Sequence, residues 1–131
     1  MTIGMDFHDA RLLELVCNSD GGGHALLRAC IFKSNGIVFE DAQESGWQNC
    51  RLVFQGMRVQ GTPAELGAYA SEGDMRVDGK SHGGLILLPA DYQGSIQINL
   101  VLSPLFETLT IHAQRITSLL EGPWELEATW E

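Results

Sequence analysis

The dipeptide His8-Asp9 contains the residue types in this sequence that are best suited to chemistry. A histidine can exchange a proton near neutral pH, and a neighbouring carboxylate can orient its ring. Adjacent residues on an extended chain point to opposite sides, however, and Asp9 can instead cap or turn the backbone before the first strand. The sequence therefore predicts a polar site at His8 and Asp9, with His112 as a third member, and leaves a purely structural role open. If these residues form a polar site, the chain is a small-ligand-binding protein or an enzyme.

The remaining histidines lack the spacing of a metal site. His24 and His82 adjoin glycine-rich turns, and His112 lies on the polar face of a predicted strand. No HExxH or paired Cys/His pattern occurs. The Gly-x-Ser-x-Gly elbow, the dinucleotide fingerprint and the P-loop are also absent. The sequence accordingly predicts no metal, no cofactor and no catalytic residue that can be named with its role.

An acidic stretch with one aromatic residue is the best candidate for a partner-binding surface. Glu40, Asp41 and Glu44 precede Trp47. Acidic side chains speed encounter with a basic partner, and tryptophan is enriched at the energetic centres of interfaces. The stretch predicts a surface that occludes a basic protein partner, while a solvated loop is the alternative interpretation.

Composition limits the classes of partner. The 131 residues carry 17 acids against 8 lysines and arginines, a net charge of −9. Nucleic acids and anionic membranes attract clustered basic residues, so we expect neither as a partner. No secretory signal or membrane-spanning run is evident, so we expect a cytoplasmic protein. The three cysteines, an odd number without close spacing, predict reduced thiols.

Two strands organise the predicted fold. Ile96, Ile98, Leu100 and Leu102 alternate with polar residues, and Leu109, Ile111 and Ala113 do the same after a turn at Ser103-Pro104. Period-two alternation puts the apolar side chains on one face of an antiparallel pair. This pattern needs a covering layer, and the rest of the chain supplies short strands with frequent turns.

The other predicted elements follow in chain order. We expect a lead-in at residues 1–10 and a loop at 40–47. Strands are predicted at residues 11–17, 25–32, 37–39 and 49–59. Thr62-Pro63-Ala64-Glu65 predicts a short helix over residues 61–70. A small hairpin at 74–79, strands at 85–88 and 124–131, and an undecided segment at 114–121 complete the chain. The fold class is mostly β, one domain over residues 1–131: an antiparallel β-sandwich or partly closed barrel with one short helix, with α+β as the alternative. An exposed sheet edge also permits a homodimer.

The segment Phe7-His8-Asp9-Ala10-Arg11-Leu12-Leu13 resembles the aromatic-His-Asp-Ala/Ser opening of a loose group of small bacterial β proteins. Leu52–Met57 and Leu109–Ala113 are similar to sheet segments of the same group. Some of its members are immunity-type proteins of polymorphic toxin systems. The resemblance implies a non-enzymatic cytoplasmic binder that neutralises a partner, and it supplies no catalytic residues.

Overall fold

The chain folds as one antiparallel sheet that curls into an incomplete ring. The computed structural model describes residues 2–34, 42–61, 68–104 and 106–129. Its strands are β1 (Thr2–Cys17), β2 (Gly23–Ser34), β3 (Ala42–Gln55), β4 (Arg58–Gln60), β5 (Tyr69–Val77), β6 (Lys80–Ser81), β7 (Leu85–Leu88), β8 (Asp91–Ser103) and β9 (Glu107–Thr129). No helix occurs among the described residues, so within them the mostly β prediction is confirmed and the α+β alternative is not.

The two strands predicted to organise the fold are present and pair with each other. Ile98 of β8 lies opposite Ile111 of β9, and Leu100 lies opposite Leu109. These four side chains are almost completely buried. The alternation was readable because each strand has one apolar and one polar face. β8 and β9 therefore form one wall of the core.

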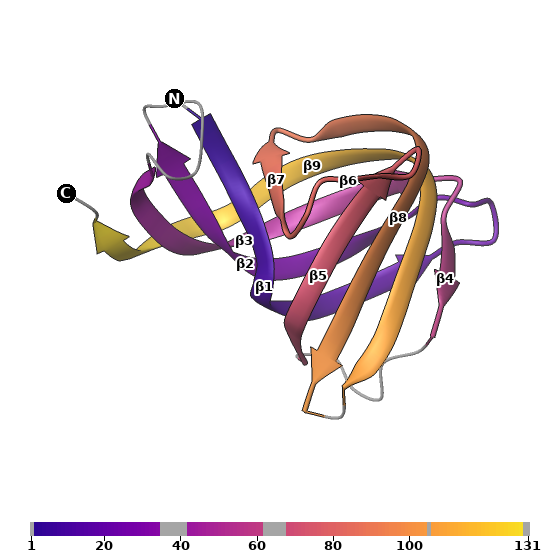
Figure 1. Cartoon of the computed structure of the whole chain (residues 1–131), viewed down its shortest axis with the longest axis horizontal. Helices are drawn as coiled ribbons and strands as arrows, with labels where there is room; N and C mark the ends of the chain where they lie inside the picture. The colour runs from indigo at the N-terminus through magenta and orange to yellow at the C-terminus, as the bar shows by residue number, and fades with distance from the viewer. Residues whose placement is uncertain (1, 35–41, 62–67, 105, 130–131) are drawn as a thin grey trace.

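The remaining strands complete the ring around this wall. The order along the sheet is β6-β5-β8-β9-β3-β2-β1-β7, and β4 pairs with β9. β5 pairs with β8 on one side and with β1 on the other, through Arg11 and Tyr69 (Figure 1). A backbone hydrogen bond from Leu12 to Ala68, just before β5, reinforces the junction of β1 with β5, and one from Phe7 to Gly84 extends the pairing of β1 with β7. The core fills the inside of the ring.

Several sequence predictions of local structure were wrong or fall outside the description. The lead-in is part of β1, because Met5 and Phe7 alternate into the core and are fully buried. Residues 42–47, predicted as loop, begin β3, because both of its edges find pairing partners in β2 and β9. The predicted helix falls largely on residues 62–67, outside the described ranges, but Tyr69 and Ala70, expected at its end, are strand. The predicted strand at 37–39 is also outside them.

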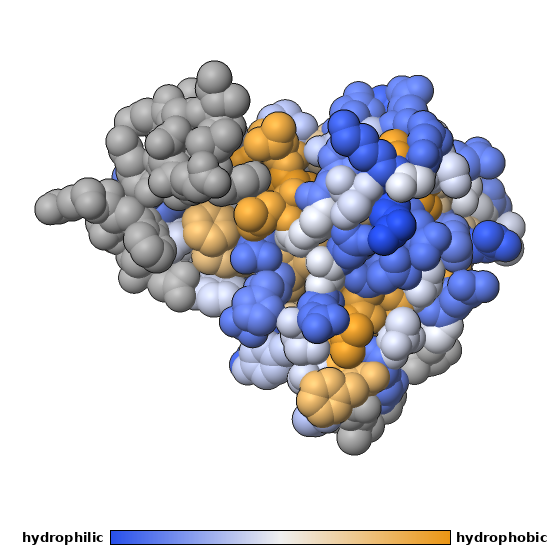
Figure 2. All heavy atoms as spheres, in the orientation of Figure 1, coloured by the Kyte–Doolittle hydropathy of each residue, from blue (hydrophilic) through white to orange (hydrophobic). Residues whose placement is uncertain are grey.

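The C-terminal strand is confirmed but covers the core only in part. β9 runs through the undecided segment 114–121 as a continuous strand. Trp124 is partly buried and packs against the core, whereas Leu126 on the same face is 59% exposed. Figure 2 shows a mainly hydrophilic surface over β5, β6 and β8, with hydrophobic atoms gathered beside β7. No helix in the described part of the chain is long and apolar enough to cross a membrane.

Candidate functional site

The His8-Asp9 segment lies in a large, irregular bulge of β1. Asp6 lies opposite Cys30 and Arg11 opposite Arg28, so residues 7–10 of β1 face the single residue Ala29 of β2. Phe7 and Ala10 of the bulge are fully buried. His8 and Asp9 are exposed between them. The bulge thus exposes the histidine and the carboxylate to solvent, while Phe7 and Ala10 at its ends are buried in the core.

The bulge brings His8 and Asp9 together, although adjacent residues of an extended strand would diverge. Asp9 has a φ of 64°, in the left-handed region that aspartate tolerates better than most residues. This turn places the Asp9 carboxylate oxygen Oδ2 3.5 Å from Nε2 of His8. The pair was predicted from residue types alone, and the positive φ that joins it was not predictable from them.

The imidazole of His8 has a fixed orientation. Its Nδ1 lies 2.9 Å from the backbone carbonyl oxygen of Ser71 on β5. A carbonyl only accepts, so Nδ1 carries the proton and donates it. The backbone N–H of His8 donates to the Asp6 carboxylate over 2.8 Å. Burial nevertheless raises the pKa of Asp6 above its ordinary value, because it disfavours the charged carboxylate.

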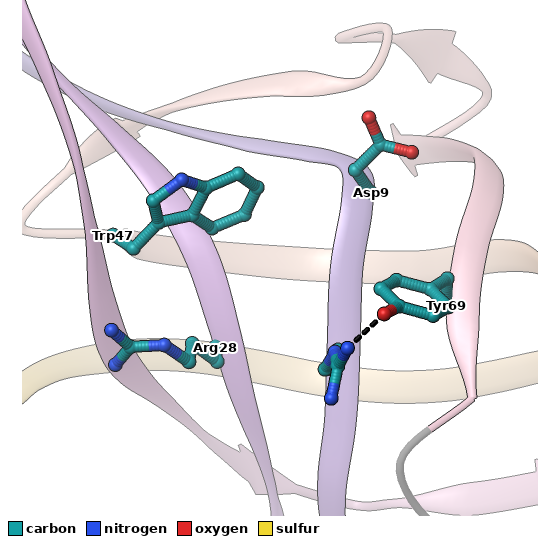
Figure 3. A pocket seen from close by; sticks show the side chains of 5 residues that line it. Asp9, Arg28, Trp47 and Tyr69 are labelled. Carbon is teal, nitrogen blue, oxygen red and sulfur yellow. Dashed lines mark hydrogen bonds between the residues drawn. The ribbon is translucent and has the colours of Figure 1, made fainter. Parts of the chain in front are cut away.

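A pocket lies beside this bulge, on the outer face of the sheet where β1 meets β5. Its volume is about 420 Å³, and Asp9, Arg11, Arg28, Trp47 and Tyr69 line it. Figure 3 shows Trp47 on one side of the β1 ribbon, Tyr69 on the other, and Asp9 where the ribbon bends. Pockets of this size accept small molecules, and its wall combines aromatic faces with charged groups.

Arg11 is the residue of this pocket with the least compensated charge. It lies directly across from Arg28, and two like charges facing each other on neighbouring strands repel. Arg28 is neutralised by Glu125 at 3.0 Å and also donates to Asn49. Within the described ranges, Arg11 has no carboxylate at ion-pair distance. The guanidinium instead lies 4.3 Å from the centre of the Tyr69 ring and donates to the Tyr69 hydroxyl.

The other predicted polar-site residue, His112, lies elsewhere. Its Nε2 is 3.2 Å from the Gln60 side chain, in a separate pocket that Arg58 also lines. His24 lies beside Glu14 and His82 packs edge-on against Tyr92. Within the described ranges no three histidine, cysteine or acidic side chains are grouped to hold a metal ion. The structure therefore unites His8 with Asp9 and leaves His112 apart from them.

The predicted acidic partner surface is only partly described. Glu40 and Asp41 lie outside the described residues. Glu44 and Trp47 lie three residues apart on one continuous strand, paired with Lys33 and Cys30 of β2, so their side chains leave opposite faces of the sheet. Trp47 instead shares its face with the two arginines of the pocket. Its surroundings are more basic than the sequence interpretation assumed.

Two of the three cysteines lie in the interior of the protein. None of the three forms a disulfide; Cys30 and Cys50 are buried and Cys17 is exposed. Burial raises the pKa of Cys50 to about 12, which keeps it protonated near neutral pH. The reduced thiols agree with the sequence interpretation, except that Cys17 is more exposed than expected.

Sequence reasoning missed Arg11, Arg28 and Tyr69 as site residues. Arg28 is the single charged residue in the apolar run Ala25–Phe32, and that interruption is the signal that could have singled it out. Arg11 and Tyr69 become neighbours only through the pairing of β1 with β5. No protein-family model, curated protein or solved structure matches this chain. The resemblance to immunity-type proteins stays a prediction, and function has to be argued from the site.

Proposed function

We propose that this chain is a small binding protein whose outer-face pocket holds a carboxylate of its ligand. The observation that carries the proposal is Arg11, which faces Arg28 and has no carboxylate partner in the described part of the chain. A bound carboxylate would relieve the repulsion between these two arginines, which is worth roughly 0.2–1 kcal/mol for a cross-strand pair. It would also use the planar donor fork that guanidinium offers to carboxylates.

The scarcity of cations in this protein supports the same assignment. Four of its eight lysines and arginines are already bound to carboxylates: Arg28, Arg51, Arg76 and Arg115. Arg11 is held instead by an aromatic ring, which leaves most of its N–H donors available. Trp47 and Tyr69 provide flat apolar surface beside it for the rest of the ligand. The pocket thus supplies a charge for one end of a ligand and aromatic faces for the other.

Replacing Arg11 tests the proposal directly. The probe is 3-phenylpropionate, with its uncharged amide as the matched compound, titrated by NMR or calorimetry. We expect Arg11→Gln to weaken binding of the carboxylate by about tenfold, because one charge-assisted interaction is lost. Arg58→Gln removes the same charge from an exposed strand residue elsewhere and should leave the affinity unchanged. Equal affinity for the acid and the amide, or no effect of Arg11→Gln, would contradict the proposal.

Occlusion of a basic protein partner is the second candidate function, and it is the role implied by the resemblance. The net charge of −9 supports it. We expect the triple reversal Glu40→Lys, Asp41→Lys and Glu44→Lys to weaken capture of a basic protein from native lysate, most strongly at low salt. The single reversal Glu72→Lys, on β5, is the control. Identical capture by the triple variant and the wild type would eliminate this candidate.

A further inference from the structure

Two opposite charges line the pocket without pairing with each other. Asp9 and Arg11 are two residues apart on β1, and both line the cavity. No nitrogen of Arg11 lies at ion-pair distance from an oxygen of Asp9. Contacts on either side hold them: Arg11 is stacked on Tyr69, and Asp9 is turned toward His8 by its positive φ. The pocket therefore keeps a cation and an anion apart.

The surroundings of Asp9 favour a donor in the ligand. Nδ1 of His8 donates to Ser71, so Nε2 is the ring nitrogen that faces the Asp9 carboxylate, at 3.5 Å. This distance is longer than that of a normal hydrogen bond, so the carboxylate oxygens keep lone pairs for a further donor. An ammonium group has the charge and the several N–H donors that a carboxylate accepts.

The two charged side chains can contact the same ligand. Asp9 and Arg11 have Cα atoms at most about 7 Å apart and line the same cavity, so one molecule bound there can contact both. The volume of about 420 Å³ agrees with a single compound of this kind. The faces of Trp47 and Tyr69 remain for an apolar or aromatic substituent.

We infer that the ligand is a small zwitterion, an α-amino acid with a large apolar side chain. Its carboxylate binds Arg11, its ammonium group donates to Asp9, and its side chain lies against Trp47. The inference rests on the proposed function for the role of Arg11 and adds the ammonium site at Asp9. Nothing in it requires a reaction.

Three related probes separate the two charged contacts. They are L-phenylalanine, 3-phenylpropionate, which lacks the ammonium group, and phenethylamine, which lacks the carboxylate. We expect L-phenylalanine to bind about tenfold more tightly than either analogue. Asp9→Asn should abolish the difference in affinity between L-phenylalanine and 3-phenylpropionate. Asparagine also tolerates a left-handed backbone, so the bulge is preserved.

Each outcome decides between the inference and the function on which it rests. Asp20→Asn, which removes a carboxylate from the turn after β1, is the matched control and should change no affinity. If 3-phenylpropionate binds as tightly as L-phenylalanine, and Asp9→Asn changes neither, the zwitterion is wrong while the carboxylate site stands. If phenethylamine matches L-phenylalanine and Arg11→Gln has no effect, the carboxylate site is wrong. Absence of binding by all three probes overturns both.

Discussion

Replacing Phe7 with alanine is expected to lower the free energy of unfolding by about 3–5 kcal/mol. Phe7 is fully buried and is among the largest side chains of the core. It lies in the bulge of β1 and packs against Gly73 of β5, so its ring fills the space where the two strands approach. Its removal leaves a cavity at a junction that the neighbouring strands cannot easily close. Urea unfolding, followed by tryptophan fluorescence, measures the loss.

An exposed phenylalanine provides the control for this substitution. Phe106, in the turn between β8 and β9, is 70% exposed, and Phe106→Ala should change stability by no more than about 0.5 kcal/mol. A loss below about 1 kcal/mol for Phe7→Ala would mean that the ring is not an integral part of the core. It would also remove the physical basis for a rigid bulge at Asp9, and with it much of the case for a preformed pocket.

The predictable parts of the fold are strands in which the alternation of apolar residues in the sequence matches the alternation of buried side chains in the structure. Ile98 and Ile111 could be placed in the core because each lies in a simple alternation, and the Ser103-Pro104 pair separates their strands. The Asp78-Gly79 turn was also predictable, because Asp-Gly favours the positive φ of a tight hairpin, which both residues adopt in the structure.

The pocket was not predictable because it depends on irregular pairing. Four residues of β1 face Ala29, and this irregularity sets Arg11 opposite Arg28. A shift of one residue would turn Arg11 toward the core, since successive side chains of a strand alternate between faces. The contact with Tyr69 further requires the ring to close through β5, a pairing between residues 58 positions apart. His8 and Asp9 could be selected by residue type, but their partners follow only from three-dimensional structure.

Gly73 tests this closure of the ring, and Gly73→Ala is expected to lower the free energy of unfolding by about 1–3 kcal/mol. A Cβ atom at this position would overlap the Cβ of Phe7 and lie 3.0 Å from its Cγ. Trimming the phenylalanine ring would not relieve the first overlap, so β5 has to move away from β1. Because Tyr69 begins β5 and holds Arg11, we expect the same substitution to weaken binding of 3-phenylpropionate.

Thermal and urea unfolding measure the first effect, and titration of the folded variant measures the second. Glu72→Ala changes the exposed neighbour on the same strand and should leave both quantities close to those of the wild type. The double variant Phe7→Ala/Gly73→Ala should be less stable than either single variant, since the two Cβ atoms still collide. A stable Gly73→Ala protein with unchanged ligand affinity would show that the approach of β5 to β1 neither limits the fold nor positions Tyr69 at the pocket.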